Sequence, residues 1–86
     1  GAYNMNYGLE GACAGRQYEL INKMIEKGAD DWNRGLSGAC WGGDLKIIQM
    51  MIDKGATDWN RGLVAACSGD NIEVIELMIQ MGYRFE

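Results

Sequence analysis

The sequence predicts an all-α fold in which three short helix–turn–helix repeats stack into a solenoid. Side chains of one type recur at intervals of about 27 residues, which is typical of a repeat protein. A chain of 86 residues would form only a marginal single core, whereas stacked repeats share one continuous core. We therefore treat residues 1–86 as one domain, with repeats at about 6–32, 33–59 and 60–86. The recurring sets include Asn6, Asn33 and Asn60; Leu9, Leu36 and Leu63; Cys13, Cys40 and Cys67; and Gly28, Gly55 and Gly82.

Residues 1–5, before the first repeat, have two interpretations. Gly1-Ala2 lies one period before Gly28-Ala29, so this segment can be the tail of a preceding repeat. The same Gly-Ala pair can instead be the scar of an expression tag. Both interpretations stay open, as do a natural, excised or engineered origin of the array and the number of repeats that flank it.

In the middle repeat, the first helix is predicted over about residues 33–41. Asp31 precedes it and can accept hydrogen bonds from the free N–H groups of the first turn. Leu36, Ala39 and Cys40 follow at helical spacing and form an apolar face. Two glycines in this helix cost about 1 kcal/mol each, so their recurrence indicates close approach between neighbouring helices.

The second helix is predicted over about residues 44–54, after a break at a Gly-Gly pair. Gly55 is expected to end it in the left-handed conformation. After Gly82 the pattern changes, and residues 83–86 are expected to cap the last repeat. The apolar stripe of this helix comprises Ile47, Ile48, Met51 and Ile52. A neighbouring register varies only in apolar type and is predicted to be core: Tyr18, Leu45 and Ile72.

The three cysteines are predicted to be buried, reduced core residues. Stacked helices lie about 10 Å apart, whereas a disulfide needs Cα atoms within about 7 Å. No Cys-x-x-Cys pair is present to hold zinc. We expect no metal and no cofactor, and reduced cysteines favour a cytoplasmic location.

Composition argues against several classes of function. The net charge is −4 with acids and bases interleaved, which argues against nucleic acid or an anionic membrane as the partner. No apolar run reaches the roughly 18 residues that would indicate a transmembrane helix. Histidine, the commonest general base, is absent, so we expect no catalytic site and no enzyme.

The middle repeat resembles the helical part of the ankyrin repeat. That family reads Leu-x-x-Ala-Ala, then Gly, a pair of aliphatic residues, Leu-Leu and Gly-Ala, and all three repeats here follow the same offsets. The matching residues are Leu36, Ala39-Cys40, Gly43, Ile47-Ile48, Met51-Ile52 and Gly55-Ala56.

The chain departs from the ankyrin pattern in two ways. Ankyrin repeats have about 33 residues, and the shortening here falls where the family has its β-hairpin finger, so we expect no hairpin. The Thr-Pro-Leu-His signature is replaced by Arg34-Gly35-Leu36-Ser37. Short repeats of this kind are similar to ones encoded by large DNA viruses of amoebae. That resemblance implies a viral protein that binds proteins in the host cytosol.

Positions that vary between repeats are candidates for partner binding, because recurring positions are usually structural. Trp41 stands where the other repeats have Ala14 and Ser68. An isolated large aromatic is a typical interface anchor, and packing into a local gap is the alternative. Another variable row consists of Glu10, Ser37 and Val64.

Five further aromatic and basic residues complete the set of candidates. Tyr7, Arg34 and Arg61 share a register near the start of each first helix and are residue types favoured at interfaces. Ordinary solvated side chains are the alternative for this row. Trp32 and Trp59 close the loops between repeats. They are either partner anchors or, as we favour because they recur, replacements for the lost hairpin that pack against the first helices.

The preferred function is a scaffold for protein–protein interaction without catalysis, with a partner of unknown identity. The alternative is a structural module. Terminal repeats without firm caps expose apolar faces, and such faces can stack end to end into a homo-oligomer, either a dimer or a fibre.

Overall fold

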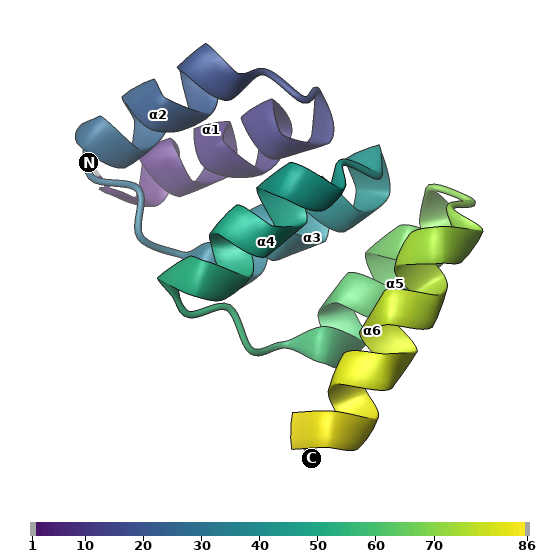
Figure 1. Ribbon diagram of the computed structural model, residues 1–86. Helices are drawn as coiled ribbons and strands as arrows, with labels where there is room; N and C mark the ends of the chain where they lie inside the picture. Colours follow the sequence, from purple (N-terminus) through teal and green to yellow (C-terminus); the bar gives the residue numbers. More distant parts are fainter. Residues whose placement is uncertain (1, 86) are drawn as a thin grey trace.

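The chain folds into three consecutive helix–turn–helix pairs, each of which consists of a first and a second helix. The computed structural model describes residues 2–85, in which every regular element is a helix (Figure 1). Within this range no residue lies in a strand, so the all-α prediction is confirmed. The helices are α1 (Ala2–Ala14), α2 (Tyr18–Glu26), α3 (Trp32–Gly42), α4 (Leu45–Lys54), α5 (Trp59–Ser68) and α6 (Ile72–Phe85).

Aspartate side chains cap the N-termini of α3, α4 and α5. Asp31 accepts a hydrogen bond from the backbone N–H of Arg34 at 3.0 Å, and Asp58 accepts from that of Arg61 at 3.1 Å. Asp44 accepts from two N–H groups in the first turn of α4 at 2.9 and 3.3 Å. Each cap satisfies donors that have no partner inside the helix. The starts of α3 and α4 therefore lie within one residue of the predicted positions.

The first and last helices extend beyond the registers at which the internal helices begin and end. Residues 2–5 begin α1, whereas residues 29–31, one period later, form a loop. Gly82 does not end α6, which continues to Phe85. Glycine permits a helix to end but does not force it, and the extra turn lets Phe85 pack on Trp59 with ring centroids 6.0 Å apart. Gly1 and Glu86 lie outside the described residues.

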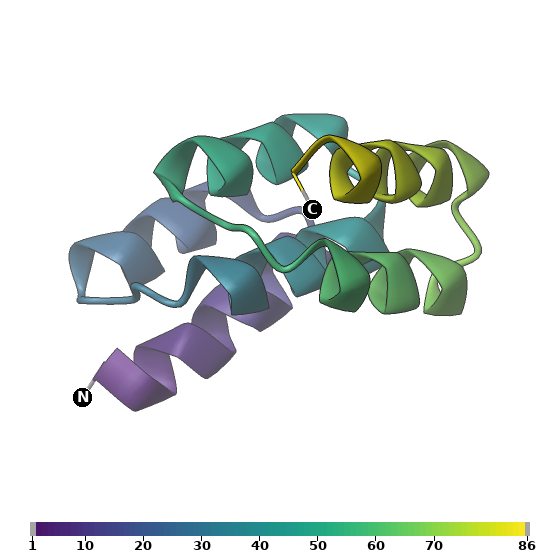
Figure 2. The same ribbon diagram turned by 90° about the horizontal axis from the view of Figure 1, so that it is seen from below.

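The helices form two layers (Figure 2). The first helices of the three pairs, α1, α3 and α5, lie side by side, and α3 contacts both of its neighbours. The second helices, α2, α4 and α6, cover one side of this layer. Contacts between pairs are therefore made mainly through the first helices. The molecule measures 34 × 23 × 18 Å along its principal axes.

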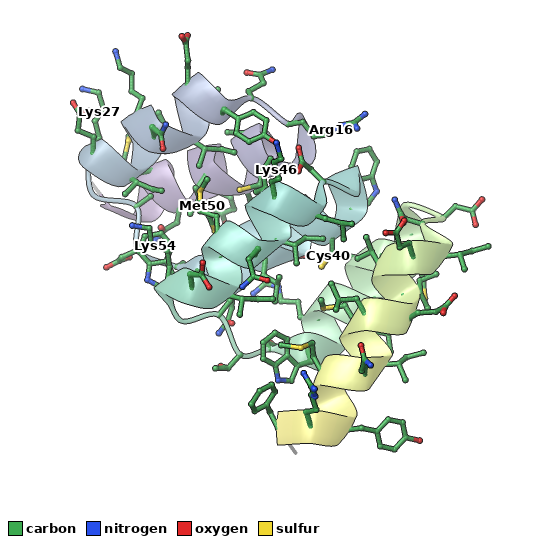
Figure 3. All side chains as sticks on the ribbon, in the orientation of Figure 1. Arg16, Lys27, Cys40, Lys46, Met50 and Lys54 are labelled. Carbon is green, nitrogen blue, oxygen red and sulfur yellow. The ribbon has the colours of Figure 1, made fainter. Side chains whose placement is uncertain are left out.

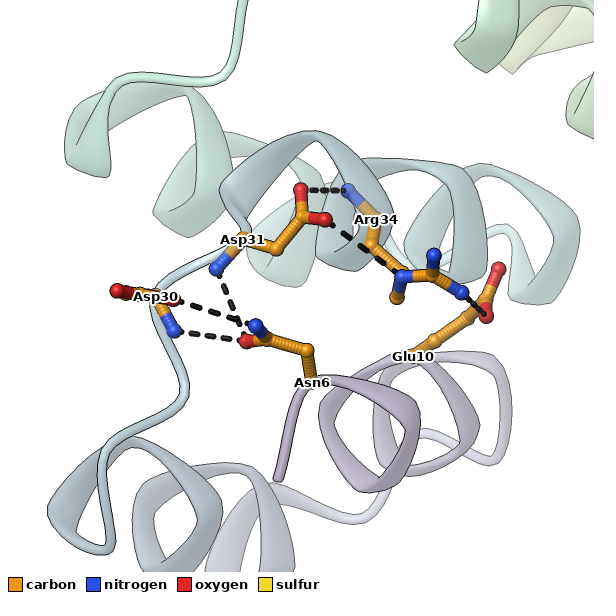
Figure 4. Close-up of polar contacts among 5 residues, drawn as sticks. All are labelled: Asn6, Glu10, Asp30, Asp31 and Arg34. Carbon is orange, nitrogen blue, oxygen red and sulfur yellow. Dashed lines mark hydrogen bonds and ion pairs between the residues drawn. The ribbon is translucent and has the colours of Figure 1, made fainter. Parts of the chain in front are cut away.

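An asparagine on each of the first two pairs binds the loop that leads to the next pair. The Oδ1 atom of Asn6 accepts hydrogen bonds from the backbone N–H groups of Asp30 and Asp31 at 2.8 and 3.0 Å (Figure 4). The Oδ1 atom of Asn33 accepts from those of Thr57 and Asp58 at the same two distances. The recurrence of asparagine at this register therefore has a structural cause, which the sequence analysis did not identify.

The predicted core of the middle pair is largely confirmed. Leu36, Ile47 and Met51 are fully buried, and Ile52 is partly buried. The prediction for Tyr18, Leu45 and Ile72 is wrong, since their exposed fractions are 41%, 43% and 69%. Each of the three is the first residue of a second helix, where the side chain has no neighbouring turn on its N-terminal side to pack against.

The prediction for the cysteines is correct at two positions and wrong at the third. Cys13 and Cys40 are fully buried, but Cys67 is exposed. Cys40 lies where the second pair meets the third (Figure 3), and a Cβ atom added to Gly62 of α5 would lie 3.3 Å from its sulfur. Within residues 2–85 no helix occupies the corresponding position beyond α5, so Cys67 stays uncovered.

No helix within residues 2–85 is both long enough and apolar enough to span a bilayer.

Candidate protein-binding face

The first helices share an outer surface that carries a shallow hollow of about 500 Å³. Because these helices lie side by side, residues one period apart line up in rows across the layer. Its lining includes the large side chains of Trp41, Arg61 and Val64, which are at positions that vary between repeats. The structure therefore brings together Trp41 and Arg61, which were predicted to bind a partner, and Val64, which was predicted only to belong to a variable row.

Trp41 combines a fixed backbone with an exposed ring. A Cβ atom added to Gly69 would lie 2.4 Å from the carbonyl oxygen of Trp41, so the backbones of the two pairs touch here. The side chain of Trp41 is nevertheless 54% exposed. Its row contains only the small residues Ala14 and Ser68, which cannot cover an indole ring. Trp41 is thus a largely exposed aromatic on a closely packed backbone, which suits an interface anchor.

Arg34 lies between the first two pairs and is fully engaged (Figure 4). Its Nη1 atom is 3.3 Å from Oε1 of Glu10, and its Nε atom is 3.6 Å from Oδ2 of Asp31. Its guanidinium carbon lies 4.5 Å from the centroid of the Tyr7 ring. Partial desolvation disfavours the charged form, but Glu10, Tyr7 and Asp31 together outweigh it and raise the pKa of Arg34. Arg34 and Tyr7 therefore join two pairs rather than forming a free binding site.

Arg61 occupies the same register as Arg34 but has a different neighbour. The residue corresponding to Glu10 is here Ser37, which also lines the hollow. Within residues 2–85, no carboxylate oxygen lies within 4.0 Å of the Arg61 guanidinium. The side chain is only partly buried, so its charge is available to a partner beside the exposed Trp41 and Val64.

Trp32 and Trp59 lie outside the hollow. Trp32 begins α3, where the Lys54 ammonium lies 5.5 Å from its ring centroid. Trp59 begins α5 and is only 7% exposed, because Phe85 covers it. Of the two interpretations of these tryptophans, the geometry of Trp59 favours the packing role.

The hollow's most exposed apolar side chain was not among the predicted binding residues. Val64 is 67% exposed, and its row also contains Glu10 and Ser37. The signal that could have identified it is the change from polar to apolar along one row of the repeats. A second hollow, of about 780 Å³, separates α4 from α6. Sequence analysis missed it because it treated one of its lining residues, Leu45, as core.

The described residues offer little reactive chemistry. Within residues 2–85 no three side chains of His, Cys, Asp or Glu are grouped so that they could hold a metal ion. Burial raises the pKa of the Cys40 thiol to about 12. Burial, followed by the charge of Glu10, raises that of Cys13 to about 12 as well. Both thiols therefore stay protonated and unreactive near neutral pH.

Comparisons with known proteins do not assign the chain to a family. No family model matches the chain, and no curated protein or solved structure matches it significantly.

Proposed function

We propose that the chain is an ankyrin-like solenoid of three short repeats that binds a protein through the outer surface of its first helices. Support for the repeat architecture comes from interactions that recur one period apart. Asp31 and Asp58 cap α3 and α5 with the same bond, and Asn6 and Asn33 bind successive loops at the same distances. Helix pairs linked in this way form the stack that a solenoid requires.

The observation that carries the proposed function is the group formed by Trp41, Arg61 and Val64. Protein interfaces concentrate their binding free energy in a few aromatic and arginine side chains at the centre of a patch. Here an exposed indole, an exposed aliphatic side chain and a guanidinium without a carboxylate partner among residues 2–85 line one hollow of about 500 Å³. The hollow is shallow and open, which suits a peptide segment or a loop of a folded protein.

The chemistry of the hollow specifies the kind of segment that it would bind. An apolar side chain of the partner would pack between Trp41 and Val64, and a carboxylate would pair with Arg61. Charge-assisted hydrogen bonds from arginine to a carboxylate are strong and directional. The expected ligand is therefore a short protein segment that contains an aspartate or glutamate next to a large apolar residue.

We also propose that this function involves no catalysis and is exercised in a reducing, cytoplasmic compartment. The sequence contains no histidine to act as a general base. The thiols of Cys13 and Cys40 are protonated near neutral pH, so neither is poised as a nucleophile. The free thiols suit a compartment in which disulfides do not form.

The test is selection from a random peptide library displayed on phage. Selection uses the wild-type chain and the variants Trp41→Ala and Arg61→Gln. Tyr83→Ala is the matched control, because it removes an aromatic that is 87% exposed on α6, away from the hollow. We expect the wild type and the control to enrich peptides that pair an acid with an apolar residue. Each hollow variant should bind those peptides at least about tenfold more weakly.

Two outcomes would count against the proposal. One is enrichment of peptides that bind all four proteins equally, which would place the binding surface elsewhere. The other is failure of the wild type to enrich any peptide with a reproducible motif.

A further inference from the structure

The second hollow, which lies between α4 and α6, has apolar walls. Its volume is about 780 Å³, and its lining includes Leu45 of α4 and Ile79 of α6. Both of these side chains are exposed, whereas Ile48, which also lines the hollow, is buried. Exposed aliphatic side chains on both helices give an apolar side chain of another molecule a surface on which to pack.

The polar link that joins α2 to α4 is missing between α4 and α6. The Tyr18 hydroxyl at the start of α2 donates a hydrogen bond to the carboxylate of Asp44, which caps α4. One period later the corresponding residues are Leu45, which has no donor, and Asn71, whose Oδ1 atom accepts from the backbone N–H of Val74 in its own helix at 3.2 Å. Among residues 2–85 no side-chain hydrogen bond joins α4 to α6, and Figure 1 shows α6 at an angle to α4.

The position of the second hollow within the array narrows the choice of occupant. Its walls belong to consecutive helix pairs, the second and the third. Repeats stack against the ends of an array, so a helix pair before α1 or after α6 would lie outside these walls. Stacking of further repeats therefore does not fill this hollow, and its occupant is a segment of different structure.

The charged groups of the second hollow are all carboxylates. They belong to Glu73 and Glu76 of α6, and the other lining side chains are uncharged. The two residues are three positions apart, so their side chains are neighbours on one face of the helix. Within residues 2–85, no basic nitrogen lies within 4.0 Å of either carboxylate. Two negative charges without a cationic partner, beside apolar walls, favour a ligand that is both basic and apolar.

We propose that the second hollow binds a short segment of a partner protein in which a lysine or arginine lies next to large apolar residues. An apolar side chain of that segment packs between Leu45 and Ile79, and its cation pairs with Glu73 and Glu76. Hydrogen bonds between a basic side chain and a carboxylate are among the stronger ones in proteins. The segment has the opposite charge to the one expected at the hollow around Trp41.

The two hollows lie on different layers of the molecule, so both can be occupied at once. The hollow around Trp41 is lined by the first helices, and the second hollow by α4 and α6. One chain then holds an acidic segment on one layer and a basic segment on the other. This inference goes beyond the proposed function and does not rest on it.

The test is selection from a random peptide library on phage with the Trp41→Ala chain as the target. This substitution disables the hollow around Trp41, so the result is independent of the proposed function. Enriched peptides are then synthesised with a fluorescent label, and their binding to the wild type and to variants is measured by anisotropy at low and high salt.

The charge variant is the double substitution Glu73→Gln and Glu76→Gln. Its matched control is Glu19→Gln with Glu26→Gln, which changes the net charge equally at two exposed positions of α2. The apolar variant is Ile79→Ala. Its control is Ile72→Ala, on the same helix, which removes an exposed isoleucine that does not line the hollow.

We expect the enriched peptides to carry a basic residue beside large apolar ones and to bind the wild type and both controls alike. The charge variant should bind them at least about tenfold more weakly, and Ile79→Ala at least about threefold more weakly. High salt should weaken binding to the wild type but hardly affect binding to the charge variant. Tyr83→Ala should also weaken it, because Tyr83 lines this hollow.

Three outcomes would overturn the proposal. One is that no basic motif is enriched. Another is that basic peptides bind the charge variant as tightly as the wild type, which would place them on another surface. The third is self-association of the wild type that the charge variant abolishes, because the hollow would then bind a second copy of this chain.

Discussion

The equivalent faces of α3 and α5 carry the same residues but have different surroundings. On α3, the side chains of Leu36 and Cys40 have no exposed surface, and Gly62 of α5 lies against the sulfur of Cys40. On α5, the side chain of Leu63 is only partly buried and that of Cys67 is exposed. Burial in this molecule therefore depends on whether a neighbouring pair is present, and residue type alone does not determine it.

The two internal contacts also differ in detail. Between α1 and α3, Gly38 lies against the backbone of α1, and Arg34 pairs with Glu10. Between α3 and α5, the residue at the register of Gly38 is Ala65, whose Cβ atom prevents an equally close approach. The Arg61 guanidinium has no carboxylate partner among residues 2–85. Substitutions at recurring registers thus decide which side chains hold the pairs together and which are free to bind a partner.

The largest expected effect comes from deleting a covered leucine. Leu36→Ala removes a side chain with no exposed surface and should lower the free energy of unfolding by about 2–5 kcal/mol. Leu63→Ala removes a partly exposed side chain and should cost less than half as much. Urea denaturation followed by circular dichroism measures both. Equal costs at the two positions would show that α5 is covered as completely as α3.

A smaller pair of effects, opposite in sign, is expected at two glycines of the same register. Gly38→Ala places a Cβ atom 2.3 Å from the Glu10 carbonyl oxygen and should destabilise the chain by about 1–2 kcal/mol, the net of overpacking and improved helix propensity. Gly11→Ala meets open space and should stabilise a dilute, monomeric chain by up to about 1 kcal/mol. Denaturation midpoints that move in the same direction for both variants would contradict the close approach of α1 and α3.

The asparagines provide the next comparison. Asn33→Ala removes an acceptor from the N–H groups of Thr57 and Asp58 and should cost about 1 kcal/mol. Asn60→Ala removes an exposed side chain without a partner among residues 2–85, so its cost should be close to zero in dilute solution. Hydrogen exchange at the amides of residues 57 and 58 provides a local readout, since only the first variant should accelerate it.

The smallest effect is expected from the ion pair between the first two pairs. Glu10→Gln should lower stability by at most about 1 kcal/mol, because both side chains are partly exposed. Ser37→Glu should give Arg61 the partner that Arg34 already has, with a gain of about 0.5 kcal/mol that disappears in high salt. Ser37→Gln is the matched neutral control. A gain from Ser37→Gln equal to that from Ser37→Glu would show that charge is not its source.

Much of the fold could be predicted from periodicity and caps. The pattern of small and aliphatic residues around Leu36 and Ile47 indicates two helices, and Asp31 and Asp44 mark where they begin. The helical character of residues 2–5 and of residues 83–85 could not be predicted in the same way. In both segments the helix continues past the register at which the internal repeats form a loop, and in α6 the extension is accompanied by the packing of Phe85 on Trp59.

The candidate site was predictable only in part. Trp41 could be singled out because the other repeats have small residues at its register. Arg61 could be singled out because its register holds only tyrosine and arginine, which are residue types favoured at interfaces. Arg34 has a carboxylate partner, whereas Arg61 has none among residues 2–85, because the residue across the interface is Glu10 in one case and Ser37 in the other. The burial of Trp59 by Phe85 depends on the extension of α6. Such outcomes follow from contacts between residues far apart in the sequence.

The most direct test of the central claim, that the cysteine of each first helix is buried only where a following pair lies against it, is the reactivity of the three cysteines. Native chain at about 1 µM, where self-association is negligible, is treated with a thiol probe at pH 7 and mapped by mass spectrometry. We predict that Cys67 reacts rapidly because it is exposed, while Cys13 and Cys40 react at least about 100-fold more slowly because they are buried. In denaturant, all three should react alike. Rapid reaction of Cys40, or protection of Cys67 equal to that of the other two in the dilute native chain, would contradict the account.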